Sequence, residues 1–445
     1  MNAATLSWLG IVRLGLVQTS LGAVVVLMTS TINRVMVVEL ALPAFVPGLL
    51  VASHYAIQLL RPAWGYRADV GGRRTPWIIL GMAVLALGGT GAALGTAMAA
   101  AHPAAGLAVA ALSFLLVGLG VGAAGTSVLA MLATRVAPER RAGAATTVWV
   151  MMIFGFALTA PLAGHFLDPF SNMRLVAVTA SVSAIAFCVA TLAIWGVETN
   201  VAAGAAPKSE KPPFREALAQ VWGEPAARRF TIFIFVSMLA YSAQELLVEP
   251  FAGVVFGMTP GTTTKLAGLQ HGGVLLGMLG VAFCASFVGG PIFGSLRLWT
   301  VGGCIASAVA LAAVAASGYV GQGDLLRVCV FALGFSNGAF AVAAIGSMMA
   351  LAGAGARSRE GTRMGLWGAA QAIAFGMGGV LATILVDAAR LVVGAPLAAY
   401  ALVFLLEALL FLVSAGMARR VTGPEHRPSR AGAELALGSS QTSNI

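Results

Sequence analysis

The stretch TPWIILGMAVLALGGTGAALGTAMAAAHPAAGLAVAALSFLLVGLGVGAAGTSVLAMLAT, residues 75–134, contains no charged side chain and decides the fold class. A helix needs about 20 apolar residues to cross a membrane, so this stretch allows two crossings with a break at His102 and Pro103. Of the 445 residues, 9% are charged and 59% are hydrophobic, and the mean hydropathy is +0.92. Soluble domains carry about 25% charged residues. The composition therefore excludes a soluble enzyme and predicts a protein that crosses the membrane many times.

Charge-free runs, cut at turn residues, predict twelve membrane-spanning helices. The predicted spans are 13–38, 44–65, 76–98, 106–133, 142–165, 175–197, 229–256, 265–290, 296–319, 325–352, 362–386 and 393–418. A polar segment with mixed charges separates the first six spans from the last six. We therefore expect an N-terminal six-helix half at 1–197, a linker with an interfacial helix at 198–228, a C-terminal six-helix half at 229–420 and a disordered tail at 421–445.

Positive charges alternate between the two sides of the predicted bundle. Of the 26 Lys and Arg residues, 20 lie in the N-terminus, in the loops after even-numbered spans or in the C-terminal tail. Cytoplasmic loops of membrane proteins are enriched in Lys and Arg, so we expect both termini and the linker on the cytoplasmic side of a bacterial inner membrane. The same distribution accounts for the net charge of +10. We therefore expect membrane lipid, and not nucleic acid, as the partner.

The two halves share a short sequence pattern. Gly143 is followed by Trp149 and Gly361 is followed by Trp367, and an arginine lies two residues before each glycine. Both pairs open the fifth span of their half, which favours a duplicated six-plus-six arrangement. In secondary transporters built this way, the substrate site lies between the halves near the middle of the membrane.

The loop after the second span resembles the major facilitator superfamily signature, in which an acidic residue, a glycine turn and an arginine pair join helix ends on the cytoplasmic side. The matching residues are Gly65, Asp69, Gly72, Arg73 and Arg74. A carboxylate pairs well with guanidinium groups, and the glycines let the backbone turn. Together with the twelve spans, this loop predicts an all-α membrane protein with the major facilitator fold and a cytoplasmic gate. The alternative is an ordinary positively charged loop.

A few polar side chains lie within the spans, where burial makes them costly and therefore functional candidates. The first span carries Asn33, Arg34 and Glu39, and the seventh carries Gln244 and Glu245. These two spans are equivalent helices of the two halves, so we expect Arg34 to pair with Glu245 across the centre. The pair is either part of a ligand site or an ion pair that only joins the halves. Glu245 is the best candidate for a proton carrier.

His54 lies near the middle of the second span, and Gln58 follows one turn later on the same face. A neutral imidazole at this depth is a candidate ligand for the magnesium of a chlorin. The alternative is a hydrogen-bonded histidine that packs between helices. His165 and His271 lie nearer the outer ends of their spans and are weaker candidates for the same role.

The string from Asn33 to Leu40, Asn-Arg-Val-Met-Val-Val-Glu-Leu, resembles the PucC/LhaA family, the bacteriochlorophyll-delivery branch of the major facilitator superfamily. The resemblance implies a membrane factor that supplies or holds bacteriochlorophyll, or a precursor, while light-harvesting complexes assemble. It implies antenna polypeptides or pigment-synthesis enzymes as partners. The compact loop at 65–74 departs from the longer loop of the antenna-assembly members, which favours a third paralogue over PucC or LhaA itself.

Two other functions remain as alternatives. A proton-coupled secondary transporter of a small or amphipathic molecule fits the fold, whereas a membrane enzyme needs a catalytic site that the sequence does not supply. The string Gly120–Gly125 matches a dinucleotide-binding pattern, and Gly334–Gly338 matches a hydrolase pattern. Both lie inside apolar spans, so we expect no catalytic residues, and we interpret the first set of glycines as packing residues.

Overall fold

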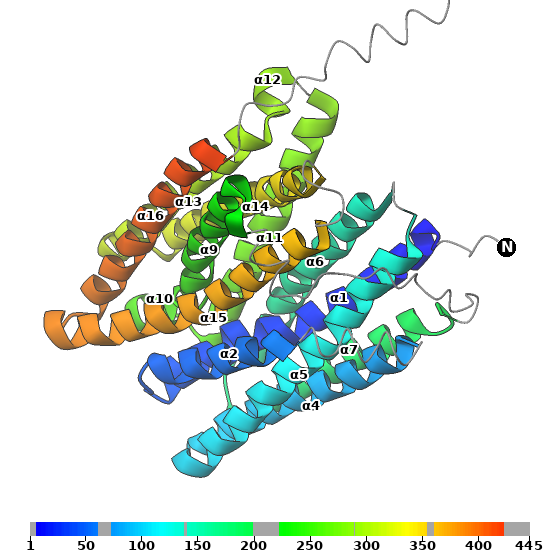
Figure 1. Cartoon of the computed structure of the whole chain (residues 1–445). Coiled ribbons are helices and arrows are strands. Elements are labelled where there is room, and N and C mark those ends of the chain that lie inside the picture. The colour runs from blue at the N-terminus through cyan, green and yellow to red at the C-terminus, as the bar shows by residue number, and fades with distance from the viewer. Residues whose placement is uncertain are drawn as a thin grey trace, which may run out of the picture.

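The computed structural model describes residues 6–60, 73–137, 140–198, 222–288, 290–353 and 360–421, which form a bundle of helices (Figure 1). Eleven helices in this part of the chain are long and apolar enough to cross a membrane, and a twelfth, Phe45–Ile57, is apolar but shorter. The chain is therefore a membrane protein, and the predicted all-helical fold is confirmed. Most of the predicted linker lies outside the described residues, which resume at Trp222. The tail from residue 422 and the end of the second span also lie outside them.

The N-terminal half contains six spans. They are α1 (Trp8–Val26, continued by wider π-type turns at Leu27–Ile32 and Val35–Glu39), α2 (Phe45–Ile57), α4 (Thr75–Ala99), α5 (Pro103–Arg135), α6 (Arg141–Leu167) and α7 (Asn172–Ile194). The C-terminal half repeats this plan with one broken helix. Its helices are α9 (Pro225–Glu245), α10 (Val248–Phe256), α11 (Pro260–Phe283), the short α12 (Gly290–Phe293), α13 (Leu296–Val320), α14 (Gly323–Gly353), α15 (Glu360–Val393) and α16 (Pro396–Val421).

The helix ends follow from local sequence. Proline occupies the first turn of α4, α5, α9 and α11, where its missing N–H leaves no helical bond unmade. Side-chain oxygens of Ser171, Thr259 and Ser295 accept hydrogen bonds from the first turns of α7, α11 and α13. After α10 and α13 the chain ends its helical path at Gly257 and Gly321, whose φ angles of 65° and 74° favour glycine.

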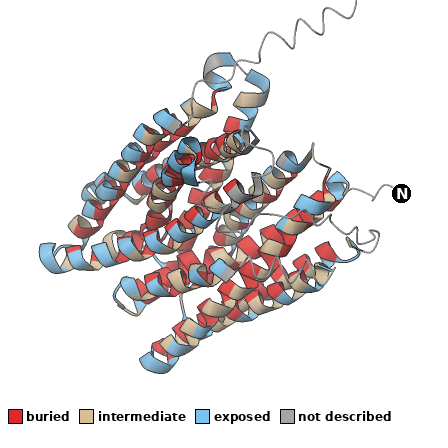
Figure 2. Cartoon of the chain, in the orientation of Figure 1, coloured by how far each residue is buried: buried red, intermediate tan, exposed pale blue. Residues whose placement is uncertain are grey.

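Glycine lets neighbouring helices approach closely within each half. A Cβ atom on Gly120 of α5 would lie 2.6 Å from the carbonyl oxygen of Gly81 in α4, so only glycine fits there. A Cβ atom on Gly334 or Gly338 of α14 would lie 2.0 Å from a carbonyl oxygen of α11. Gly120 therefore acts in helix packing, as predicted. Buried residues form one apolar cluster in each half, and the outward surfaces of the helices are exposed (Figure 2) and carry many apolar residues.

The halves meet along two seams that run through the bundle (Figure 1). The first seam is α2 against α15, and the second seam is α6 against α11. A Cβ atom on Gly48 would lie 2.3 Å from Thr383 at the first seam, and one on Gly268 would lie 2.4 Å from the ring of Pro161 at the second. We call the side where α1 begins and α16 ends the terminal side, and the opposite side the distal side.

Candidate functional site

Arg34 is buried between α1 and the loop that joins α10 to α11, with 2% of its surface exposed. Its guanidinium donates to the carboxylate of Glu39 and, at 2.6 Å, to the carbonyl oxygen of Met258 between α10 and α11. The prediction that Arg34 pairs with Glu245 is therefore wrong. Arg34 and Glu39 are five residues apart, and the π-type turns of this segment bring residues at that spacing onto one face.

Two uncharged contacts join α1 to the C-terminal half beside this ion pair. The amide of Asn33 donates to the carbonyl oxygen of Leu246 at 2.8 Å, at the break between α9 and α10. The hydroxyls of Thr31 and Thr264 lie 2.9 Å apart across α1 and α11. The break between α9 and α10 leaves a backbone carbonyl group free to accept this bond. Non-helical backbone occurs at membrane depth only where it is buried in protein or lines a cavity. Asn33 was predicted as a site residue, whereas the two threonines were not.

The seventh span carries two acidic residues, Glu245 and Glu249. Glu249 is 3% exposed and lies near Ser30, Arg34 and Glu245. Glu245 keeps part of its surface accessible. The acidic residue of the other half that interacts with Arg34 is thus Glu249, one turn beyond the predicted residue. The sequence offered this signal, because Glu249 is a second acid in the same span.

Several polar atoms of this cluster are buried without a partner among the described residues. They are Asn33 Oδ1, Arg34 Nε, Gln244 Oε1 and Glu249 Oε2. Buried polar groups are nearly always hydrogen-bonded, because an unpaired one costs about 1–3 kcal/mol. These four atoms, from α1, α9 and α10, are sealed from solvent and mark a candidate site for buried water, or for the polar edge of a ligand if the helices part. We call these four residues, with Glu39 and Glu245, the central polar cluster.

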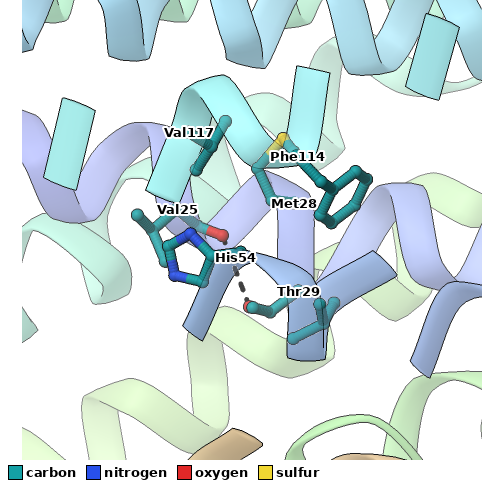
Figure 3. A pocket seen from close by; sticks show the side chains of 7 residues that line it. Val25, Met28, Thr29, His54, Phe114 and Val117 are labelled. Atoms are coloured by element: carbon teal, nitrogen blue, oxygen red, sulfur yellow. Dashed lines mark hydrogen bonds between the residues drawn. The ribbon is translucent and has the colours of Figure 1, made fainter. Parts of the chain in front are cut away.

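His54 lies among residues of the N-terminal half, beside Val25, Met28 and Phe114 (Figure 3). Its Nε2 atom lies 2.9 Å from the amide nitrogen of Gln58, as the one-turn spacing predicted. The space beside it is too small to hold a water molecule and is lined by apolar residues of α1, α2 and α5, with Thr29 among them. Sites for drug-sized ligands measure about 300–1,000 Å³. Magnesium ligation by His54 stays a prediction, and it requires Gln58 to turn away and the cavity to widen.

The predicted gate loop is described only at its end. Gly65, Asp69 and Gly72 lie outside the described residues, and Arg73 is exposed. Arg74 donates through its side chain to Ala130 and Thr134 of α5.

Glu198, which follows α7, caps the first turn of α4 on the terminal side. Its carboxylate accepts the backbone N–H groups of Arg74 and Thr75 at 2.8 Å each. Burial alone raises the pKa of Glu198, but these hydrogen bonds outweigh it and lower the pKa below its usual value of 4.5.

Two aspartates that the sequence did not single out close the distal ends of the seams. Asp387 of α15 accepts the backbone N–H groups of Ala44 and Phe45, at 3.1 and 2.8 Å, where α2 begins. Asp168, after α6, accepts the Thr259 hydroxyl at 2.8 Å and the backbone N–H of Gly261 at 3.2 Å, where α11 begins. Each half thus supplies a carboxylate to a helix N-terminus of the other half, where the positive end of the helix dipole favours it.

Other proteins are similar to this chain over almost its whole length. The family model described as PUCC protein matches residues 31–426. The "Bacteriochlorophyll synthase 44.5 kDa chain" of Rhodobacter capsulatus is 54% identical over 417 residues, which cover 94% of this chain and 96% of that protein. "Protein PucC" of Cereibacter sphaeroides is 31% identical over 428 residues, which cover 89% of this chain and 88% of that protein.

Solved transporter structures have the same fold. A bacterial homologue of the human lysosomal transporter Spinster, in an inward-facing and occupied conformation, matches with a TM-score of 0.67 at 16% identity, covering 93% of this chain and 96% of that one. A point mutant of the nucleoside transporter NupG matches with a TM-score of 0.67 at 14% identity, covering 93% of this chain and 99% of that one. The major facilitator fold predicted from the sequence is confirmed by these matches.

Proposed function

Because the chain belongs to the PUCC family, we propose that it binds bacteriochlorophyll or a precursor in the membrane and delivers it for the biogenesis of light-harvesting complexes. The resemblance noted at residues 33–40 agrees with this membership, and the name of the 54% identical relative contains the word bacteriochlorophyll. The partners that we propose are antenna polypeptides or pigment-synthesis enzymes. The proposed location is the bacterial inner membrane, with both termini in the cytoplasm.

The central polar cluster is the observation that carries this proposal. Its unpartnered atoms lie among apolar membrane-spanning helices, which suits a ligand that is mostly apolar with polar groups at one edge. A chlorin with an isoprenoid tail has this chemistry, because keto and ester oxygens border a flat apolar ring. Arg34 Nε is a donor for such an oxygen, while Asn33 and Gln244 are adaptable amides.

The 54% identical relative carries the word synthase in its name. For this chain we propose binding and delivery without catalysis. The catalytic alternative predicts that the purified protein converts a bacteriochlorophyll precursor to product with its co-substrates present. Incubation of the protein with labelled precursor and chromatography of the pigments would distinguish conversion from binding.

Proton-coupled transport is the second candidate function, and the transporter fold favours it. Glu245 is the proposed proton carrier, because it is an acid between the halves with part of its surface accessible. This function predicts that uptake into proteoliposomes depends on a proton gradient and is lost in Glu245→Gln.

The test of the primary proposal is purification from a pigment-making host in mild detergent, followed by absorption spectroscopy and pigment extraction. We expect bacteriochlorophyll or a precursor with the wild-type protein and a reduced amount with Gln244→Ala. Gln322→Ala, which changes an exposed amide in a distal loop, serves as the matched control. Absence of tetrapyrrole under conditions that retain antenna pigments would reject pigment binding and favour transport.

A further inference from the structure

The two seams repeat the same pattern of contacts from the distal side inward. In α6 and α15 an aromatic ring precedes the capping aspartate by twelve positions, as Phe156 precedes Asp168 and Phe375 precedes Asp387. In the facing helices a second ring follows the capped backbone N–H by ten positions. In α2 Tyr55 follows the N–H of Phe45, and in α11 His271 follows the N–H of Gly261. The duplicated halves therefore place a ring pair at equal depth on each seam.

The ring pairs differ in chemistry. At the first seam Tyr55 lies 5.6 Å from Phe375, centre to centre, and Phe375 lies 5.7 Å from Tyr241 of α9. At the second seam Phe156 lies 4.9 Å from His271, edge to face. His271 thus occupies the position that Tyr55 occupies at the first seam, and an imidazole replaces a phenol. Phe156, Tyr55, Phe375 and Tyr241 all remain partly accessible inside the bundle.

The side of α11 that carries His271 faces the centre of the molecule. Ala267, one turn earlier, packs with Val26 and Leu27 of α1, and Thr264, one turn before that, bonds to Thr31. The opposite side of α11, at Leu269 and Leu276, is exposed toward the lipid. His271 is 6% exposed and lies on the inner face.

The hydrogen bond of His271 determines which ring nitrogen is available. Nδ1 lies 2.9 Å from the carbonyl oxygen of Ala267, and a carbonyl oxygen only accepts, so Nδ1 carries the proton. In the neutral ring Nε2 then carries the lone pair. In the described chain Nε2 has no hydrogen-bond partner, and it is not among the polar atoms sealed from solvent. Metal-binding histidines are commonly oriented in this way, by a bond from the other ring nitrogen to a backbone carbonyl.

We propose that Nε2 of His271 is the axial ligand of a magnesium tetrapyrrole that binds between the two seams. Phe156 of the second seam, and Tyr55 and Phe375 of the first, would border the tetrapyrrole ring. The assignment rests on the proposed pigment-binding function and names the metal ligand within it. His54 differs from His271 because its Nε2 already faces the Gln58 amide, and the space beside it is too small for a water molecule.

The test compares bacteriochlorophyll a with bacteriopheophytin a, which has the same macrocycle and tail without the metal. Both pigments are titrated into the purified protein in detergent, and binding is followed by quenching of tryptophan fluorescence. We expect the wild-type protein to bind the magnesium pigment about tenfold or more tightly than the metal-free one, as loss of a metal contact commonly costs. His271→Leu should lose this preference and bind both pigments equally weakly, while His54→Leu should retain it.

Coordination is checked separately, because a variant that folds poorly also loses binding. The Qx absorption band of bacteriochlorophyll responds to the number of axial ligands on magnesium, so imidazole added to pigment-loaded His271→Gly should restore the wild-type band. Equal binding of both pigments by the wild-type protein would overturn the ligand assignment and leave pigment binding intact. Binding of neither pigment would reject the proposed function together with the assignment. Preference lost in His54→Leu and kept in His271→Leu would transfer the ligand role to His54.

Discussion

Arg34 shows how one residue can join two halves of a membrane protein. Its side chain is 3% exposed in the pair with Glu39, and it also binds the Met258 carbonyl of the other half. We expect Arg34→Gln to destabilise the protein by about 1–3 kcal/mol, because the Met258 carbonyl loses its donor, whereas the Glu39 carboxylate that is left is 35% exposed. Arg327→Gln is the control, since its pair with Asp324 is exposed and is worth about 0.2–1 kcal/mol. Thermal unfolding in detergent measures both, and equal effects would contradict a joining role for Arg34.

The residue scale also shows where sequence reasoning stops. Asn33, Arg34, Glu39 and Gln244 could be singled out as candidate site residues because polar groups in a span are rare and costly. The partner of Arg34 could not be predicted, since it depends on π-type turns that the sequence pattern does not reveal. The Thr31 contact was missed for another reason, because a threonine hydroxyl in an apolar run also bonds to its own helix backbone.

At the scale of helices, the close approach of α4 and α5 depends on one glycine. In Gly120→Ala the new Cβ atom would lie 2.6 Å from backbone atoms of Gly81 and Leu85, so the helices must separate. Overpacking of this kind costs about 1–3 kcal/mol. A Cβ atom on Gly122, two residues later in the same helix, meets nothing within 4 Å, so Gly122→Ala should be neutral or slightly stabilising. Melting temperatures of the two variants test the difference, which should disappear if α4 and α5 do not pack here.

Glu198 gives the start of α4 a dependence on pH. Its folded pKa lies below the usual 4.5, so its contribution is complete above pH 4.5 and is lost as the pH falls through the folded pKa. A carboxylate cap is worth about 1 kcal/mol. We expect the melting temperature of the wild-type protein to fall below pH 4.5 more steeply than that of Glu198→Gln. Asp324→Asn, which changes an exposed carboxylate, should follow the wild-type curve. Parallel curves for all three proteins would show that the cap does not form.

At the scale of the whole molecule, the number of spans could be predicted from the sequence, whereas the contacts between the halves could not. Twelve spans could be predicted because the thickness of the membrane fixes the length of each apolar run. The duplication was visible in the Gly143 and Gly361 patterns, and both lie in the first turn of α6 and α15. The seams were not visible, since Asp168 and Asp387 bind backbone N–H groups about a hundred to several hundred positions away, which no side-chain pattern announces.

The two aspartate caps together hold the distal side closed, and their effects should be separable by seam. Asp387→Ala removes the acceptor for the backbone N–H groups of Ala44 and Phe45, while Asp168→Ala removes the acceptor for that of Gly261. Each cap is worth about 1–2 kcal/mol, so local opening should become roughly tenfold more frequent. Hydrogen exchange should therefore quicken at the start of α2 in Asp387→Ala and at the start of α11 in Asp168→Ala.

The double variant, in which Asp168 and Asp387 are both replaced by Ala, tests whether the two seams open independently or together. If the halves rock as units, each single substitution should quicken exchange at both seams, because opening of one seam opens the other. If the seams open separately, each effect stays local and the double variant shows the sum in free energy. A protein that holds pigment in place is expected to give the second result. A transporter that alternates between its two sides requires the first, so this comparison also separates the two candidate functions.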